Sequence, residues 1–230
     1  MSAETLDGAS RAELTDTVKA SLRSSIAHAE RCAIPYRHFI ASKVFPPGVA
    51  EDLRRLPFEV AGVDGVSGKR ELHNETRRYF DAANCARFAA CAAVADAFQS
   101  TEVARAVEAA TGADLSGSYV RLEYAQDSDG FWLEPHTDLG VKRFTMLIYL
   151  RAGGGQDDLG TDIYADHETW AKRTAFADNT ALLFVPAPDT WHGLERRPIA
   201  GVRTSVIMNY VTDGWRARGQ LAYPNLPVLS

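Results

Sequence analysis

The sequence has few cysteines, no long apolar run and no excess of positive charge, and each shortage excludes a class of protein. Three cysteines in 230 residues (Cys32, Cys85 and Cys91) are too few and odd in number for a disulfide framework, which favours a reducing compartment. No apolar run approaches the roughly 20 residues of a membrane-spanning helix. The formal net charge of −5 provides no overall positive field for nucleic acid. Composition therefore predicts a cytoplasmic protein without membrane or nucleic-acid partners.

The chain does contain enough apolar residues for one packed domain. Its hydrophobic content is 46% over 230 residues, and it shows no internal repeat, low-complexity tail or linker. We therefore expect residues 1–230 to form a single domain. Residues 1–115 are expected to be mostly helical support, and residues 116–220 to carry the functional core.

The first half has the periodicity and punctuation of helices. Ser10 and Glu13 have the spacing of a capping box, and apolar residues then recur every four positions, which predicts an amphipathic helix ending before Pro35. We expect a strand over residues 36–44, a short helix over 46–56, and a loop or irregular hairpin over 61–74. One helix is expected over residues 82–99, and another from Ser100 to residue 110, closed by Gly112.

From residue 116 onward the pattern changes to short runs of β-branched and aromatic residues, separated by Gly, Pro and Asp. These runs cover residues 118–125, 144–150, 180–185 and 203–211. Helices followed by a series of short strands predict a mainly β fold with flanking helices, in which a helical support packs on a β-sandwich or jelly roll.

The residues that carry chemistry are His136-Thr137-Asp138 and, far downstream, His192. Side chains alternate along a strand, so His136 and Asp138 are expected on one side of it. Two imidazoles and one carboxylate form the ligand set that holds iron(II) on one face of an octahedron and leaves the other positions open. We therefore expect His136, Asp138 and His192 to bind a metal.

His192 opens a strand-like run over residues 203–211 after a short turn, and this run carries further polar residues. Arg203 suits a bidentate clamp for a carboxylate, and Ser205 adds a hydroxyl two residues on. Alternation also places Asn209 on this face, where an unsatisfied buried amide would cost about 1–3 kcal/mol. Asn209 is therefore expected to touch substrate or the groups behind the ligands, or else to bond neighbouring backbone.

The order HxD, distant His and Arg-x-Ser resembles the iron(II)- and 2-oxoglutarate-dependent dioxygenases of the prolyl-4-hydroxylase-like branch, over roughly residues 116–220. The resemblance implies a double-stranded β-helix (jelly-roll) core. It also implies an enzyme that uses Fe(II), 2-oxoglutarate and O2 to hydroxylate an unactivated C–H bond, with release of succinate and carbon dioxide. Arg203, Ser205 and Tyr149 would then bind the cosubstrate's distal carboxylate, and Tyr124 would line the same pocket. For both tyrosines, ordinary core packing is the alternative.

Substrate contacts are less sharply indicated. Trp132 and Trp191, each close to an expected ligand, are candidates for aromatic walls near the iron. Arg121, Lys142 and the segment 74–79 are candidates for polar or anionic recognition, with a structural or solvated role as the alternative. Basic pairs such as Arg77-Arg78 are expected to be solvated surface. The glycine-rich stretch 153–160 is either a lid or a plain loop.

The sequence lacks the motifs of related and unrelated enzymes that catalyse other reactions. Asp138 fills the position that related halogenases leave open for chloride, and Asn209 stands where related nucleic-acid demethylases carry a second arginine. His167-Glu168 lacks the second histidine of a zinc-protease helix. The expected substrate is a small molecule such as an amino acid, a sugar or a natural-product intermediate. A peptidyl-prolyl hydroxylase and a non-catalytic jelly-roll metal-binding protein are the alternatives, and the oligomeric state, monomer or homodimer, is open.

Overall fold

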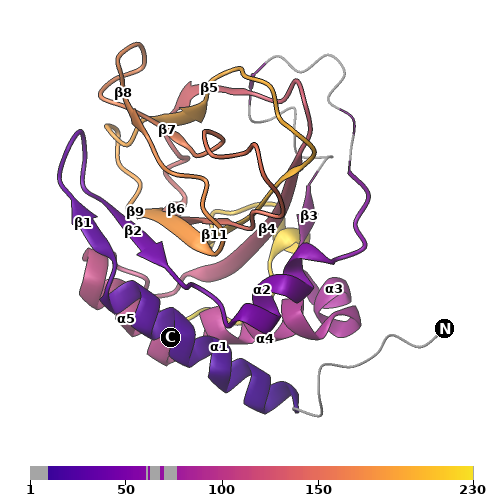
Figure 1. Cartoon of the computed structure of the whole chain (residues 1–230). Helices are drawn as coiled ribbons and strands as arrows, with labels where there is room; N and C mark the ends of the chain where they lie inside the picture. Colours follow the sequence, from indigo (N-terminus) through magenta and orange to yellow (C-terminus); the bar gives the residue numbers. More distant parts are fainter. Residues whose placement is uncertain (1–9, 61, 63–67, 70–76, 230) are drawn as a thin grey trace.

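Two antiparallel sheets face each other, and helices cover the outer face of the larger sheet (Figure 1). The computed structural model describes residues 10–60, 62, 68–69 and 77–229. The larger sheet has the strand order β1-β2-β9-β6-β11-β4-β3, and the smaller has the order β5-β10-β7-β8. This is the expected mainly β architecture, a double-stranded β-helix with flanking helices.

The strands of the larger sheet include all four runs expected after residue 116. They are β1 (Glu30–Cys32), β2 (His38–Ser42), β3 (Arg78–Tyr79), β4 (Tyr119–Asp127), β6 (Lys142–Tyr149), β9 (Thr180–Phe184) and β11 (Arg203–Val211). The smaller sheet consists of β5 (Leu133–His136), β7 (Asp162–Tyr164), β8 (Trp170–Arg173) and β10 (His192–Leu194). The sequence analysis was wrong to join His192 to the run 203–211, because β10 and β11 belong to different sheets.

The N-terminal helix begins as the capping box predicts. In α1 (Arg11–Ala27), the Ser10 hydroxyl accepts from the Glu13 backbone N–H and the Glu13 carboxylate accepts from the Ser10 N–H. The strand expected over residues 36–44 is β2, and the short helix expected next is α2 (Pro47–Arg54). The loop expected over residues 61–74 lies almost wholly outside the described residues.

The single helix expected over residues 82–99 is wrong. Two helices, α3 (Ala82–Arg87) and α4 (Ala89–Gln99), meet at Phe88, whose backbone is extended with φ −125° and ψ 115°. The break allows the Phe88 ring to pack edge-on against Phe58, with ring centroids 5.5 Å apart. Tertiary packing has thus overridden an alanine-rich helical pattern. The next helix, α5 (Thr101–Thr111), ends as expected at Gly112, which has φ 77°.

Alternation along the central strands divides the apolar residues into two cores. Val206, Met208 and Tyr210 of β11 face the helices, and a second cluster lies between the sheets. Tyr210 donates its hydroxyl to the carbonyl of Phe98 in α4. A central strand such as β11 is buried on both faces. Each polar side chain on it must therefore make a hydrogen bond inside the protein or face a pocket.

Tyr124 belongs to the helix-side core, so its expected place in the cosubstrate pocket is wrong. Its hydroxyl donates to the Leu53 carbonyl of α2 at 2.8 Å, and its ring packs against Phe58 and Phe80. The cause is the register of β4: Arg121 and its alternate residues face the space between the sheets, which turns Tyr124 towards the helices.

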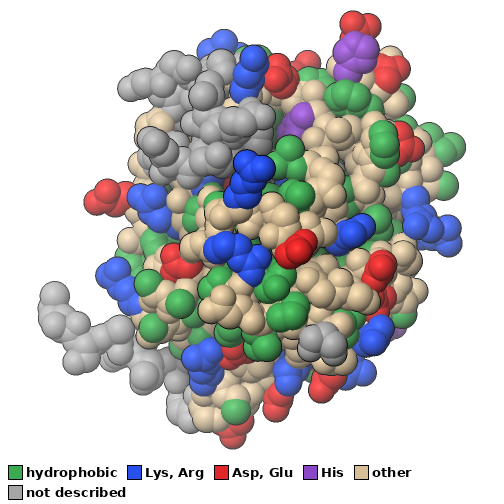
Figure 2. Space-filling view, turned by 180° about the vertical axis from the view of Figure 1, so that it is seen from behind, with side chains coloured by type: hydrophobic (Ala, Val, Ile, Leu, Met, Phe, Trp, Pro, Cys, Tyr) green, Lys and Arg blue, Asp and Glu red, His purple; other side chains and the backbone are tan. Residues whose placement is uncertain are grey.

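In the space-filling view, acidic and basic side chains are interspersed over the face that it shows (Figure 2). Among the residues that the structure describes, no helix is both long enough and apolar enough to cross a membrane.

Tyr124→Phe is expected to lower the free energy of unfolding by about 1 kcal/mol, because it removes the buried hydrogen bond from the tyrosine hydroxyl to the Leu53 carbonyl and leaves that carbonyl with the longer bond from the Leu56 N–H. Urea denaturation measures this loss. Tyr119→Phe is the control, since the Tyr119 hydroxyl makes no hydrogen bond within the described residues. A change in 2-oxoglutarate affinity without a loss of stability in Tyr124→Phe would contradict the placement of this side chain.

Candidate active site

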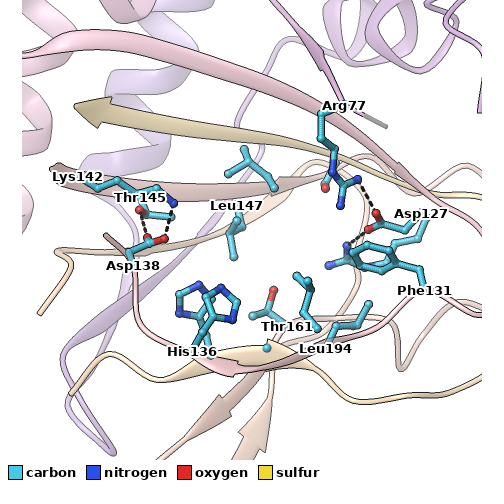
Figure 3. Close-up of a pocket in the computed structure, with 16 residues that line it drawn as sticks. Arg77, Asp127, Phe131, His136, Asp138, Lys142, Thr145, Leu147, Thr161 and Leu194 are labelled. Atoms are coloured by element: carbon cyan, nitrogen blue, oxygen red, sulfur yellow. Dashed lines mark hydrogen bonds and ion pairs between the residues drawn. The ribbon is translucent and has the colours of Figure 1, made fainter. Parts of the chain in front are cut away.

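A narrow cavity of about 60 Å³ lies between the two sheets (Figure 3). In the figure, His136 and Asp138 lie at one end of it, and Arg77 and Asp127 lie at the other. His192 lines the first end beside His136, and Arg203 lines the second, where it bonds Asp127. Apolar side chains form the stretch between these ends, among them Leu133, Leu147, Leu194 and Ile207. One pocket therefore brings together the histidines and the arginine that the sequence singles out.

His136 and His192 are direct partners across the paired strands β5 and β10, and their ring centroids lie 4.4 Å apart. Gly193 permits this close approach, because a Cβ there would come within 2.8 Å of the Leu133 carbonyl oxygen. The Nδ1–H of each ring donates to the backbone carbonyl two residues earlier, at 2.8 Å for His136 and 3.0 Å for His192. This bonding places the ring lone pair on Nε2, the arrangement typical of metal-ligating histidines.

Asp138 lines the same pocket but is held by other partners. β5 ends at His136, so Asp138 lies beyond the strand, and the expected alternation through it is wrong. One carboxylate oxygen accepts from the Lys142 ammonium, and the other accepts from the Thr145 hydroxyl at 2.5 Å. Within the described residues, no three His, Cys, Asp or Glu side chains are yet grouped closely enough to hold one metal ion. His136 and His192, two of the expected ligands, thus lie in contact with each other. Asp138, the third, lines the same pocket but is not yet within one ligand group with them.

The electrostatics of Asp138 favour the ionised form. Burial opposes the charge, but the positive charge of Lys142 and the two hydrogen bonds outweigh it, so the pKa of Asp138 lies well below its ordinary range. A carboxylate rather than a carboxylic acid therefore faces the pocket at neutral pH, as metal binding requires.

A chain of buried hydrogen bonds supports Asp138 from behind. Thr145 Oγ1 accepts from Asn209 Nδ2 at 2.9 Å, and Asn209 Oδ1 accepts from Arg121 Nη1 at 3.0 Å. Asn209 is 0% exposed and does not line the pocket. Its expected contact with substrate is therefore wrong, because its amide is hydrogen-bonded to Thr145 and Arg121 instead. The alternative, a role behind the ligands, agrees with this geometry.

Arg203 and Ser205 line the far end of the pocket. Arg203 Nε donates to the Leu159 carbonyl at 2.7 Å, and Nη1 donates to Asp127 at 2.6 Å. Within the described part of the chain, Arg203 Nη2 and the Ser205 hydroxyl make no hydrogen bond. These two donors are therefore available to an anionic ligand in the pocket.

Tyr149 lies beside Arg203, with its ring 5.9 Å from the guanidinium carbon, but it does not line the pocket. Its hydroxyl bonds the side chains of Thr161 and Thr174, both at 2.7 Å. Thr161 itself lines the pocket. The direct cosubstrate contact expected of Tyr149 stays a prediction, and in the present arrangement its hydroxyl is used by the threonines.

Arg77 lines the pocket and belongs to the segment 74–79 that was a candidate for anionic recognition, whereas the expectation that the Arg77-Arg78 pair is solvated surface is wrong for Arg77. Its side chain is 2% exposed, its Nη1 donates to Asp127 at 2.6 Å, and its Nε lies 3.4 Å from Glu123. The Phe131 ring packs against its guanidinium. The available clue was indirect: once Glu123 and Asp127 are placed on the inner face of β4, two buried carboxylates require cations.

No protein-family model and no curated protein sequence matches the chain. Solved structures do. A prolyl-4-hydroxylase of Pseudomonas putida shares 13% identity over 85% of this chain and 94% of its own, with a TM-score of 0.52. A Phytophthora capsici prolyl 4-hydroxylase shares 15% identity over 91% and 67% of the two chains, with a TM-score of 0.55. A Trichoplax adhaerens prolyl hydroxylase, in complex with a hypoxia-inducible-factor peptide fragment, shares 13% identity over 88% and 93%, with a TM-score of 0.56.

The chain has the prolyl-hydroxylase jelly-roll fold. The resemblance read from HxD, His and Arg-x-Ser is thereby confirmed at the level of fold. In this fold the histidine pair and the arginine of the present chain meet in one pocket between the sheets.

The two tryptophans expected as aromatic walls do not line the pocket, so that expectation is wrong. The Trp132 ring lies on Gly68, where an added Cβ would come within 2.5 Å of it. Trp191 packs near His167, with ring centroids 5.9 Å apart, because it precedes the inward-facing His192 and turns the other way. Arg121 and Lys142 do line a cavity, the one of about 250 Å³ beside Asp138.

The stretch 153–160 is anchored over its second half. Gln156 donates to the carbonyls of Ala200 and Val202 at 2.8 and 3.1 Å. Leu159 is 0% exposed, and its carbonyl accepts from Arg203. These contacts favour a fixed loop that supports Arg203 over a lid.

Burial and the neighbouring His136 lower the pKa of His192 to about 4. In the unfolded chain the pKa of this imidazole is about 6.5, so the unfolded state binds a proton more readily than the folded state does. The stability contributed by neutral His192 is therefore complete above about pH 6.5 and is lost as the pH falls from there towards about 4.

We expect the metal-free protein to lose about 2 kcal/mol of unfolding free energy through His192 between about pH 7 and about pH 5. Urea denaturation at the two pH values, in wild type and in His192→Gln, measures the difference. The exposed His28→Gln variant is the control and should keep the wild-type dependence. An equal pH dependence in His192→Gln would show that His192 is not the buried neutral group described here.

Proposed function

We propose that this chain is an iron(II)- and 2-oxoglutarate-dependent oxygenase that hydroxylates a small molecule. One observation carries the proposal: a histidine pair with its lone pairs on Nε2 lies at one end of a pocket, and Arg203 and Ser205 lie at the other. A five-carbon keto diacid needs both ends, a metal for its keto acid and a cation for its distal carboxylate.

The side chains at the first end fit iron(II). His136 and His192 would supply imidazole nitrogens, and Asp138 would supply a carboxylate oxygen in place of its present bond to Lys142. Iron bound by such a set, with its cosubstrate, supplies the activation of O2. The support from Thr145 and Asn209 fixes the position from which Asp138 acts.

The other residues bind the cosubstrate and keep water away. Arg203 Nη2 and the Ser205 hydroxyl would bind its distal carboxylate, and Thr161 would contribute a further hydroxyl. Leu147, Leu194 and the Phe131 ring form the apolar walls between the two ends. Such walls strengthen the ionic contacts inside by excluding solvent.

The preference for a small molecule is supported by the size of a second cavity beside Asp138, about 250 Å³, which is just below the range of about 300–1,000 Å³ that is usual for small-ligand sites. A peptidyl-prolyl substrate is the second candidate, and the peptide bound to the Trichoplax adhaerens enzyme is the observation in its favour. The third candidate, a metal-binding protein without catalysis, has no need of the donors at Arg203 and Ser205.

Anaerobic titration of the iron(II)-loaded protein with 2-oxoglutarate is expected to produce the weak visible charge-transfer band of keto-acid chelation. Arg203→Ala should weaken 2-oxoglutarate binding by at least about tenfold, because a buried charge-assisted pair is lost. Arg151→Ala, which removes a half-buried guanidinium paired to Asp157 near the surface, is the matched control and should leave binding unchanged. Absence of the band in wild type would favour the non-catalytic alternative.

A screen for substrate-stimulated succinate release separates the two catalytic candidates. The panel holds free amino acids, sugars, nucleotide sugars and proline-containing peptides. Stimulation by one of the small molecules is the expected result, since the cavity beside Asp138 is small. Stimulation by peptides alone would replace the first candidate with the second.

A further inference from the structure

Arg77 reaches the cosubstrate pocket from outside the core expected over residues 116–220. Every other described residue that lines this pocket lies between positions 127 and 207 of the chain. Arg77 directly precedes the edge strand β3, and Figure 3 shows it beside Asp127, at the end of the pocket opposite His136. Its side chain is 2% exposed, so its charge must be compensated inside the protein or by a ligand.

Asp127 bridges the two arginines at this end. One of its carboxylate oxygens accepts from Arg77 Nη1 and the other accepts from Arg203 Nη1, both at 2.6 Å. Because all three side chains line the pocket, the bridge holds two guanidiniums at the same end of it. Each guanidinium spends its Nη1 on the bridge and keeps its Nη2 for another acceptor.

Arg77 retains donors that no described residue accepts. Its Nε lies 3.4 Å from the Glu123 carboxylate without making a hydrogen bond, and its Nη2 makes none within the described residues. Nε is closed off from solvent, whereas Nη2 is not, so Nη2 is the donor that can meet a ligand in the pocket. The Phe131 ring packs against the guanidinium, 5.0 Å from its central carbon, and fixes the side chain in this position.

Neither carboxylate near Arg77 belongs to it alone. Glu123 accepts from Arg121 Nη2 at 2.5 Å, and Asp127 is shared with Arg203. Arg77 therefore adds positive charge to the end of the pocket where Arg203 is already present. Two cations at that end favour a ligand whose terminus is charged over one whose terminus is neutral.

We propose that Arg77 is a second residue that binds the distal carboxylate of the cosubstrate, and that it determines the specificity for a keto diacid over a keto monoacid. The proposal rests on the proposed oxygenase function. Arg77 and Arg203 would each donate Nη2 to the ligand carboxylate, as they donate Nη1 to Asp127. A keto acid of the same length without this carboxylate would leave both Nη2 groups without an acceptor.

The test is anaerobic titration of the full-length iron(II) protein with 2-oxoglutarate and with 2-oxopentanoate, which has the same length but a methyl group at its far end. Both can chelate iron through the keto acid, so the visible band reports the Kd of each. Wild type is expected to bind 2-oxoglutarate at least about a hundredfold more tightly. Arg77→Met should weaken 2-oxoglutarate by about tenfold or more and leave 2-oxopentanoate within about twofold, and Arg77→Lys should lie between.

Arg54→Met is the matched control, because Arg54 is also a largely buried arginine bonded to two carboxylates but does not line the pocket. It should bind both keto acids as wild type does. An equal loss for the two keto acids in Arg77→Met would show a purely structural role, and no loss for 2-oxoglutarate would show no role. Either result would overturn the proposal.

A second measurement needs only wild-type protein and a lysine variant, in case Arg77→Met does not fold. In the diamagnetic zinc(II)-loaded protein, ¹⁵N NMR of the arginine side chains should show two guanidiniums that shift with 2-oxoglutarate and not with 2-oxopentanoate. One of the two signals should be missing in Arg77→Lys. A shift of a single guanidinium that persists in Arg77→Lys would assign the carboxylate to Arg203 alone. Failure of the oxygenase function is seen separately, as absence of the iron(II) band with 2-oxoglutarate in wild type.

Discussion

The pairing of charges buried between the two sheets is the constraint on which the site depends. The inner face of β4 presents Arg121, Glu123 and Asp127, each 1% exposed or less. An unpaired ion in such a place costs several kcal/mol, so each must find an opposite charge at contact distance. Glu123 bonds Arg121 from its own strand, Asp127 bonds Arg203 from β11, and Arg77 contacts both carboxylates. The same pairs therefore join β4, β11 and the chain before β3.

This network reaches the metal end of the pocket as well. Arg121 donates to Asn209, Asn209 donates to Thr145, and Thr145 donates to Asp138. The support of the expected metal ligand and the support of the expected carboxylate-binding arginine are therefore parts of one buried polar system. In a medium of low dielectric such bonds reinforce one another, and a disturbance at one end is felt at the other. That arrangement holds both ends of a ligand site in fixed register before any ligand enters.

Sequence reasoning succeeded where a local pattern decides the structure and failed where tertiary contacts decide it. The capping box and the long strands follow from local spacing and periodicity, and the structure has both. Strands of three or four residues show no clear alternation, so β7 and β8 of the smaller sheet were not located from the sequence. The helix break at Phe88 depends on a distant phenylalanine. The face to which Tyr124 points depends on the register of β4, and the burial of Arg77 depends on carboxylates some fifty residues away.

The charge count of the buried network around Arg203 favours an anionic ligand in this pocket. Three guanidiniums (Arg77, Arg121 and Arg203) face two carboxylates (Glu123 and Asp127), so the buried group carries one net positive charge. A ligand carboxylate beside Arg203 would bring this charge to zero and would use the donors that Asp127 leaves over. A neutral ligand would leave the excess charge buried, and a cation would add to it. Arg77 is essential to this balance: without it, Asp127 and an entering carboxylate would share a single arginine and repel each other.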